Sequence, residues 1–383
     1  MKKKTLSFEF MFIYALMAPY QYCIGQETSR DSSIIAEFGK CLSIDIKKDN
    51  LHGSMSAAII KDSAVIWAGA FGYATGDKDI AADTNTIYRI GSISKTFTAA
   101  ILMQLVEEGK VKLDDPVEKY LPEIRSLKGY SDQTIITLHE LASHTSGLKR
   151  EPDLPGAGLG PVDQWESKVL SCIPYTSFAN APGVRYQYSN IGYSLLALAL
   201  QRASGVPYLQ MVQQRIFTPL HMDNTFFSIP ENRKAKVADG IVNFDENVRE
   251  QLNNTPSFQG ILDSTLGGYT TPSGGIYSTS VDLAKFVIAL MGKTPLLKPE
   301  SLREMQVPGP GGTRYGLGLM SAQHKELKFE GHEGIAPGFN AQFTIEQHNI
   351  YAVILLRNYN RGETNLTLGS RKLLYKLSKS NSR

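Results

Sequence analysis

Residues 91–109 read GSISKTFTAAILMQLVEEG. The run over residues 96–106 is almost continuously apolar, which predicts a helix over residues 92–108 that is buried on most of its sides. The glycine that closes the stretch is common just beyond a helix C-terminus. Ser92 and Lys95 stand three positions apart at the start of this helix, so their side chains share one face and can touch.

Ser92 and Lys95 together suit nucleophilic catalysis. A serine hydroxyl is a poor nucleophile until a base takes its proton. Burial in apolar surroundings lowers the pKa of a lysine, so that its neutral amine can act as this base or as a relay to one. The free N–H groups at a helix start also favour developing negative charge. The alternative is an N-cap serine followed by a surface lysine, but the apolar run after Lys95 argues for burial.

A second polar group, Tyr188-Ser189-Asn190, stands in a predicted loop. It precedes another strongly apolar helix, predicted over residues 193–203 and ended by the glycine and proline that follow. A tyrosine near a lysine can become a phenolate, which accepts a serine proton. An asparagine amide can hydrogen-bond a substrate amide. The alternative interpretation is a tyrosine-rich loop that packs on the core.

A third group, His332-Glu333-Gly334, follows a predicted strand. A small residue on an edge strand lets a peptide-like substrate approach the backbone and pair with it. The imidazole of His332 is then able to orient or protonate the substrate. The alternative interpretation is a strand-end histidine that is bonded to the backbone.

Strands are predicted toward both ends of the chain, and helices between them. Apolar and β-branched segments predict a hairpin near the N-terminus, four strands near the C-terminus and a closing helix. We therefore expect an α/β lobe made from residues 35–91 and 265–383, with a helical lobe of residues 92–264 inserted between its halves. The predicted strands cover residues 53–60, 64–73, 315–321, 327–332, 339–346 and 350–358, and the closing helix covers residues 363–377.

The overall composition excludes several classes of protein. The chain has 383 residues, 42% of them hydrophobic and 20% charged, which rules out disorder, collagen and coiled coil for the whole chain. The formal net charge is +3, and it falls to +1 without residues 1–25, which hold three lysines and one glutamate. A near-neutral chain gives no support for nucleic-acid binding. Beyond the N-terminus, no run of about 18 apolar residues predicts an interior membrane-spanning helix.

The N-terminus has the features of an export signal. Lys2-Lys3-Lys4 forms a positive region, residues 10–17 (FMFIYALM) form a short apolar region, and the small residues Cys23 and Gly25 follow. This pattern predicts a secretory signal peptide over residues 1–25 and a mature chain over residues 26–383 that is exported to the periplasm or the medium. A retained N-terminal anchor is the alternative.

Removal of residues 1–25 leaves two cysteines, Cys41 and Cys172. They are able to pair in an oxidising compartment, but two separate buried thiols are the preferred interpretation. Neither a CxxC pair nor a Cys/His cluster indicates zinc. His139 and His144 are five positions apart, one more than in the zinc motif H-E-x-x-H, so they point in different directions on a helix. We expect no metal site.

In order and rough spacing, the three polar groups resemble the active-site motifs of the penicillin-binding-protein and β-lactamase serine hydrolases. These motifs are S-x-x-K, then Y-x-N or S-x-N, then K-T-G or H-x-G. The resemblance is closest to the class C β-lactamase-like branch, which includes D-alanyl-D-alanine carboxypeptidases, D-aminopeptidases and some esterases. It covers nearly the whole mature chain, with similar segments at residues 84–95, 136–148, 182–193, 274–286 and 331–339.

This resemblance implies a β-lactamase/transpeptidase-like fold of the α/β (α+β) class, an antiparallel sheet flanked by helices with an inserted helical lobe. It also implies an acyl-enzyme mechanism. Ser92 would attack a carbonyl, Lys95 and Tyr188 would move its proton to the leaving group, and water would then release the acyl group. The resemblance implies a small-molecule or peptide substrate and no metal or organic cofactor. We expect a monomer.

The resemblance assigns substrate-binding residues as well. Asn190 would bind the substrate amide, and His332 and Gly334 would line the cleft on the edge strand. The backbone N–H groups of Ser92 and Ile335 would form the oxyanion hole, which is commonly a large electrostatic contribution to acyl transfer.

The third motif departs from K-T-G, and H-x-G is more typical of the D-alanyl-D-alanine peptidase and D-aminopeptidase members. Strand alternation points the side chain of Glu333 away from those of its two neighbours. A Glu333 that faced the cleft would repel the carboxylate of a penicillin or of a terminal D-alanine. The favoured function is hydrolysis of D-alanyl-peptide or peptidoglycan-type amides. The alternatives are a class C-type β-lactamase, an esterase or D-aminopeptidase, and a non-hydrolytic penicillin- or peptide-binding protein.

Overall fold

The computed structural model describes residues 29–75, 80–242, 267–310, 312–348 and 350–381, so the predicted signal peptide over residues 1–25 lies outside the described residues. Within the described part, seven strands form one antiparallel sheet in the order β3-β2-β1-β9-β8-β7-β6. Strands from the two ends of the chain meet where β1 pairs with β9. The strands are β1 (Ser54–Lys61), β2 (Ala64–Thr75), β3 (Ile80–Ala81), β6 (Met320–His324), β7 (Leu327–Ala336), β8 (Phe339–Glu346) and β9 (Tyr351–Arg357).

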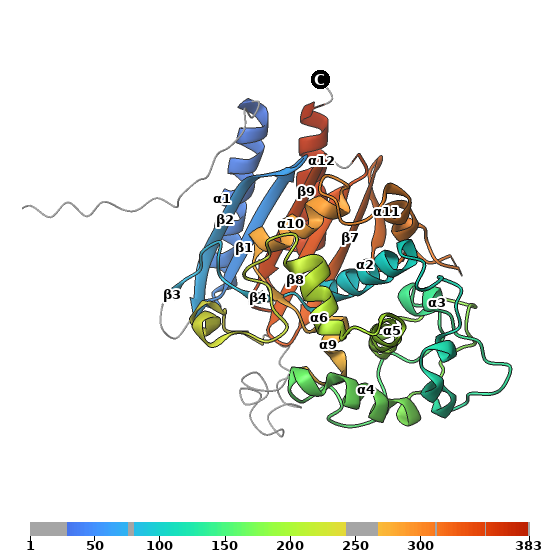
Figure 1. Cartoon of the computed structure of the whole chain (residues 1–383). Coiled ribbons are helices and arrows are strands. Elements are labelled where there is room, and N and C mark those ends of the chain that lie inside the picture. The colour runs from blue at the N-terminus through green and yellow to red at the C-terminus, as the bar shows by residue number, and fades with distance from the viewer. Residues whose placement is uncertain (1–28, 76–79, 243–266, 311, 349, 382–383) are drawn as a thin grey trace, which may run out of the picture.

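Both faces of the sheet are covered. Helices α1 (Ser29–Asp49) and α12 (Leu366–Asn381) lie side by side on one face, and α10 (Ser280–Leu290) lies on the other (Figure 1). Along β1, Ala57 and Ile59 face the core under α1 and α12, whereas Ala58 and Ile60 face the larger core. Because strand side chains alternate between two buried faces, the central strand β9 is apolar from Tyr351 to Leu356.

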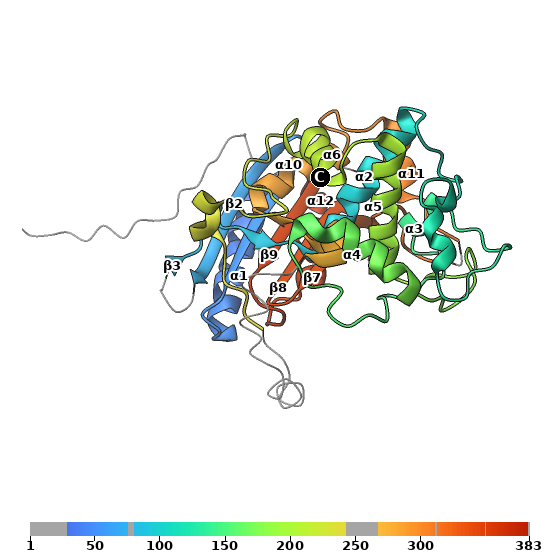
Figure 2. The same ribbon diagram turned by 60° about the horizontal axis from the view of Figure 1, so that its bottom comes forward.

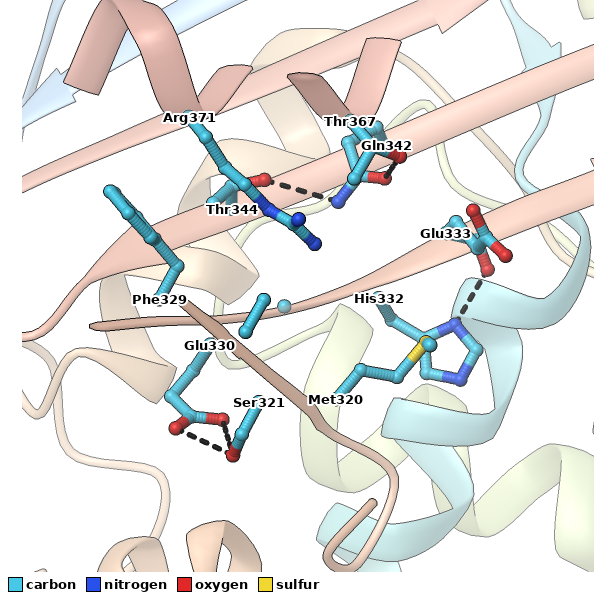
Figure 3. A pocket seen from close by; sticks show the side chains of 12 residues that line it. Met320, Ser321, Phe329, Glu330, His332, Glu333, Gln342, Thr344, Thr367 and Arg371 are labelled. Atoms are coloured by element: carbon cyan, nitrogen blue, oxygen red, sulfur yellow. Dashed lines mark hydrogen bonds between the residues drawn. The ribbon is translucent and has the colours of Figure 1, made fainter. Parts of the chain in front are cut away.

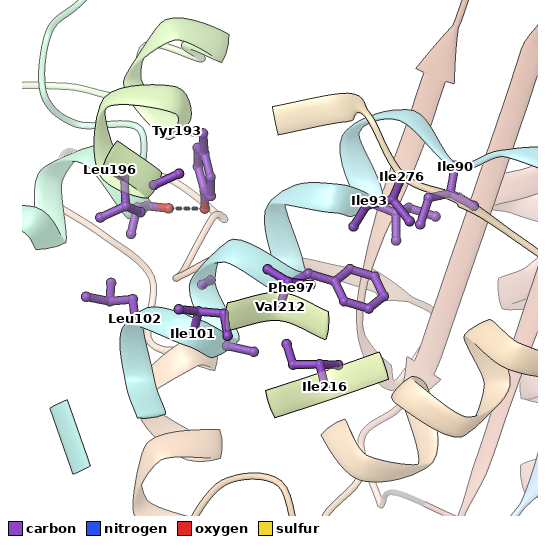
Figure 4. Close-up of a cluster of buried hydrophobic side chains, with 14 of the residues drawn as sticks. Ile90, Ile93, Phe97, Ile101, Leu102, Tyr193, Leu196, Val212, Ile216 and Ile276 are labelled. Atoms are coloured by element: carbon purple, nitrogen blue, oxygen red, sulfur yellow. Dashed lines mark hydrogen bonds between the residues drawn. The ribbon is translucent and has the colours of Figure 1, made fainter. Parts of the chain in front are cut away.

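The larger core continues into a group of helices beside the sheet (Figure 2). Its centre is α2 (Ser94–Glu107), which follows a short 3₁₀ turn, η1 (Gly91–Ile93). Figure 4 shows Phe97 and Ile101 of α2 among the side chains of this core. The other helices of this group are α3 (Leu138–Ala142), α4 (Trp165–Cys172), α5 (Asn190–Ser204), α6 (Tyr208–Val212) and α9 (Thr271–Gly274).

Most predicted elements are confirmed, with local differences. The predicted strand 315–321 is wrong, since β6 begins only at Met320. A glycine just before β6 explains this. Gly318 has φ +69°, and a Cβ there would lie 2.7 Å from the Cβ of Ala99 on α2. The chain therefore packs closely against that helix before it enters the sheet. The helices that the sequence analysis did not predict include α1, α10 and α11 (Pro299–Gln306).

Cys41 is exposed on α1 and Cys172 is buried in α4, and both are free thiols. The prediction of two buried thiols is therefore correct for Cys172 and wrong for Cys41. Among the described residues, no helix is both long and apolar enough to cross a bilayer. The boundaries of the two predicted lobes stay a prediction.

The stacked pair Phe97–Phe286 allows a test of the larger core. Their rings lie 3.8 Å apart between centroids, and Phe286 is fully buried. Phe286→Ala should lower the free energy of unfolding by about 3–5 kcal/mol, because it removes apolar contacts and leaves a cavity. Urea unfolding measures this change. Leu368→Ala, at a position 39% exposed on α12, is the control and should change stability by less than about 1 kcal/mol. Equal effects of the two substitutions would contradict this account of the core.

Candidate active site

The turn that carries Ser92 is wedged between α2 and strand β7. Gly91 has φ +50°, and a Cβ there would lie 2.8–2.9 Å from backbone atoms of Ile335. A Cβ at Gly334 would lie 1.9 Å from the carbonyl oxygen of Ile90. Two glycines thus let the backbones approach, and this close packing fixes Ser92 beside the strand. The turn is also bonded to α2, because Ser94 Oγ donates to the carbonyl of Gly91 at 2.8 Å.

Lys95 is fully buried in the first turn of α2. In the described chain, its Nζ lies 3.1 Å from Ser92 Oγ, 2.8 Å from Asn190 Oδ1 and 2.7 Å from the carbonyl oxygen of Ser273 in α9. Burial lowers the pKa of Lys95 well below its ordinary value. A neutral amine has two N–H groups, and the two carbonyl oxygens accept both of them. Its lone pair is then left to face the hydroxyl of Ser92.

Tyr188 is the second group in contact with Ser92. Its hydroxyl donates to Ser92 Oγ at 2.7 Å. Burial raises the pKa of Tyr188 above its ordinary value. The phenol therefore keeps its proton in the resting site, whereas the sequence analysis allowed a phenolate at this position. Lys95 Nζ and the guanidinium of Arg150 lie 4.8 and 4.9 Å from the centre of its ring, so both groups pack against the phenol.

Asn190 stands at the start of α5, which Ser189 caps by accepting the N–H of Gly192. Its Oδ1 accepts from Lys95, and its Nδ2 donates to Glu151 Oε1 at 2.6 Å. The hydroxyl of Tyr269 donates to the other oxygen of the same carboxylate. Sequence reasoning missed Glu151, Tyr269 and Ser273. Ser273 directly precedes the segment 274–286, whose resemblance to the family was the one signal near it.

An open cleft lies over Ser92. Among the described residues, its walls include Ser92, Asn190 and Ile335, and the side chain of Ile335 is 61% exposed. Two charged residues of the loop after α3, Arg150 and Glu151, also line it. Lys95 and Tyr188 lie behind the serine. The geometry thus offers a hydroxyl, a neutral amine, a phenol and a nearby backbone, which together suit acyl transfer.

Residues 45–374 match the family model described as Beta-lactamase. The chain belongs to the β-lactamase family. The resemblance and the fold that it implied are therefore confirmed, and solved structures agree. A structure described as the octameric penicillin-binding protein homologue from Pyrococcus abyssi superimposes with a TM-score of 0.72 at 25% identity, over 90% of this chain and 77% of that one. A β-lactamase/D-alanine carboxypeptidase from Yersinia pestis gives 0.69 at 26% identity, over 91% and 98%.

A curated relative, the D-alanyl-D-alanine-carboxypeptidase/endopeptidase AmpH of Escherichia coli, is 34% identical over 223 residues, which are 57% of this chain and 52% of AmpH. The chain spans about half to two thirds of the length of the first curated relatives that it matches. One structural relative is described as octameric, so the expected monomer stays a prediction.

His332 of this β-lactamase-family chain does not line the cleft as expected. His332 is only 1% exposed, so its imidazole is buried in the core beside β7. Its Nδ1 lies 2.6 Å from the carbonyl oxygen of Glu333, so Nδ1 carries the proton, and Nε2 accepts from the hydroxyl of Tyr315 at 2.9 Å. Burial lowers the pKa of His332 to about 3. Gly334 does not line the cleft as expected either. Its Cα faces the carbonyl of Ile90, so the lack of a side chain makes room for the turn that carries Ser92.

Glu333 lies on the opposite face of β7 from His332. The two side chains leave the strand in different directions, and Glu333 lies on the side of Arg371 and Thr367 of α12 (Figure 3). These residues line a separate small hollow. The interpretation that Glu333 faces away from the cleft is therefore the correct one. Strand β6 pairs with β7 over residues 327–331, so within the described part the segment after residue 331 extends past β6 at the edge of the sheet.

His144, which the sequence analysis rejected as a zinc ligand, supports Tyr188. Its Nδ1 accepts the backbone N–H of Ser189 at 3.1 Å, and its ring centre lies 4.3 Å from that of Tyr188. Burial lowers the pKa of His144 well below its ordinary value, so the ring is neutral. The residue thus holds the loop that carries Tyr188 without adding a charge.

The buried neutral His332 predicts a loss of stability in acid. Its pKa is about 3 in the folded protein and 6.5 when exposed, so the unfolded chain binds a proton first as the pH falls. His332 therefore contributes roughly 2 kcal/mol less to the free energy of unfolding at pH 5 than at pH 7. Urea unfolding at both pH values should show a smaller loss for His332→Gln than for the wild type. The exposed control His348→Gln should keep the wild-type difference. Identical losses in all three proteins would contradict a neutral buried His332.

Proposed function

We propose that the chain is an exported serine hydrolase that forms an acyl-enzyme at Ser92 and cleaves D-alanyl-peptide or peptidoglycan-type amides. One observation carries the proposal: Ser92 Oγ lies 3.1 Å from the buried amine of Lys95 and 2.7 Å from the hydroxyl of Tyr188. The family and the relatives described as D-alanine carboxypeptidases support the reaction class. The predicted signal over residues 1–25 supports export.

Acylation begins with proton transfer from Ser92 to Lys95. The Ser92 oxygen attacks the substrate carbonyl, and the neutral amine of Lys95 takes the hydroxyl proton. The backbone N–H groups of Ser92 and Ile335 stabilise the negative oxygen that forms. When the carbon–nitrogen bond breaks, Tyr188 gives its proton to the leaving nitrogen, and the proton held by Lys95 restores the phenol. The products are a Ser92 ester and a free amine.

Deacylation uses the same groups with water in place of the leaving amine. Water attacks the carbonyl carbon of the Ser92 ester and gives a proton to Lys95. The bond to Ser92 Oγ breaks, the serine oxygen takes back a proton, and a carboxylic acid leaves. The rate of deacylation distinguishes a peptidase or β-lactamase, which releases its acyl group, from a protein that retains it.

Carboxylated substrates stay within the proposal because Glu333 is not among the residues that line the cleft over Ser92. The same observation favours a second candidate, hydrolysis of β-lactams. A β-lactam ring would open by the same attack of Ser92, and its amine would remain tethered to the acyl group.

The proton relay predicts a specific loss of activity in three variants. With a peptide that ends in D-alanyl-D-alanine, Ser92→Ala should abolish release of D-alanine. Lys95→Ala and Tyr188→Phe should each lower kcat/KM by about a hundredfold or more, since each removes a group of the relay. Tyr175→Phe, at a half-exposed tyrosine outside the cleft, is the matched control and should retain wild-type kinetics. A Ser92→Ala protein that kept most of its activity would refute the mechanism.

Intact-mass spectrometry with benzylpenicillin tests which chemistry dominates. A Ser92-dependent adduct with slow loss of the drug, together with release of D-alanine from the peptide, is the expected result. Rapid drug loss that needs Ser92 would identify a β-lactamase instead. A stable adduct with no turnover of any substrate would identify a non-hydrolytic binder. If neither an adduct nor loss of the drug is observed, esters and D-amino-acid amides are the substrates to test next.

A further inference from the structure

We propose that Glu151 is a positioning residue that acts on Lys95 through the amide of Asn190. This inference rests on the proposed function of Ser92 and Lys95. Glu151 Oε1 accepts from Asn190 Nδ2 at 2.6 Å, and Asn190 Oδ1 in turn accepts from Lys95 Nζ at 2.8 Å. The carboxylate thus reaches the general base through one side chain.

The direction of the Asn190 amide matters because its two ends are chemically opposite. The carbonyl end accepts a hydrogen bond, and the amino end donates one. With Oδ1 toward Lys95, the amine donates one N–H to Asn190 and the other to the carbonyl of Ser273. Its lone pair is then free to accept the proton of Ser92. With the amide reversed, Nδ2 would offer an N–H to that lone pair and would compete with the hydroxyl of Ser92.

A carboxylate is the group that selects the productive direction. Ionised Glu151 can only accept hydrogen bonds, so Asn190 can turn only its amino end toward it. The carboxylate is itself held on two sides. The hydroxyl of Tyr269 donates to Oε2, and Nε of Arg150 lies 3.3 Å from Oε1. Burial raises the pKa of Tyr269, which keeps the phenol protonated as a donor.

Glu151 has a second, separable effect through its charge. Burial lowers the pKa of Lys95, and the negative charge of Glu151 opposes this by favouring the ammonium form, while Arg150 acts in the same direction as burial. Loss of the charge should therefore lower the pKa of Lys95 further. The orientation and charge effects can be separated, because glutamine keeps an oxygen that accepts from Asn190 without the charge, whereas leucine keeps neither.

The experiment measures the rate of Ser92 acylation by a fluorescent penicillin from about pH 4 to pH 10 in the full chain. Glu151→Gln should keep the plateau rate within about threefold, and its acidic limb should move to lower pH. Glu151→Leu should show the same shift of the limb and lose about ten- to a hundredfold of the plateau rate. Tyr269→Phe should lose less than Glu151→Leu, because the carboxylate remains.

Controls separate this inference from simple unfolding and from failure of the proposed function. Glu231→Leu, at a glutamate whose side chain is 85% exposed, should leave the whole profile unchanged. Thermal unfolding checks that each variant is folded. Should Ser92→Ala still be acylated, the proposed function itself would fail. Should acylation need Ser92 while the Gln and Leu variants behave alike, only the positioning role of Glu151 would be overturned.

A change in KM alone would also overturn the inference. Glu151 lines the cleft, so direct contact with a substrate is the competing explanation. Direct contact would raise KM for some substrates and leave the plateau acylation rate and the acidic limb in place. The positioning role instead lowers the plateau for esters, peptides and penicillins alike, because all of them need the lone pair of Lys95.

Discussion

The burial of a single amine, Lys95 Nζ, is the constraint on which the site depends. An apolar helix carries it into the core, and burial removes the solvation that would keep it charged. Two carbonyl oxygens from distant parts of the chain, Asn190 Oδ1 and the backbone of Ser273, then fix how the neutral amine is turned. In the proposed mechanism, the helices α5 and α9 that pack on α2 therefore orient Lys95 as the base for Ser92.

The sheet contributes through the close approach of β7 to the serine turn. Gly91 and Gly334 lie where the two backbones touch, and any side chain at these positions would collide with the opposite backbone. This contact brings Ile335 and Ser92 to the same wall of the cleft. The oxyanion hole in the proposed mechanism therefore rests on packing between the two parts of the fold, and the third motif acts through its backbone and its glycine more than through the side chain of His332.

The sequence predicted what depends on local pattern and missed what depends on distant partners. The apolar run after Lys95 predicted α2, and alternation predicted β8 over the residues that form it. Alternation also placed Glu333 on the correct face of β7. The burial of His332 was not predictable, because its partner Tyr315 lies 17 positions earlier in a segment expected to be a strand. Glu151 gave no local signal, since its contact with Asn190 spans 39 positions.

Burial favours the neutral forms of the groups around Ser92, and this explains how the fold tolerates them. Burial lowers the pKa values of Lys95 and His332 and raises that of Tyr188, which in each case favours the uncharged form. A buried neutral group with hydrogen-bond partners costs far less than a buried charge. In the proposed mechanism a positive charge arises on Lys95 only as the serine oxygen attacks. The carbonyl oxygens around the amine, and the carboxylate of Glu151 beyond Asn190, then interact more strongly with the transition state than with the resting enzyme, which is the condition for catalysis.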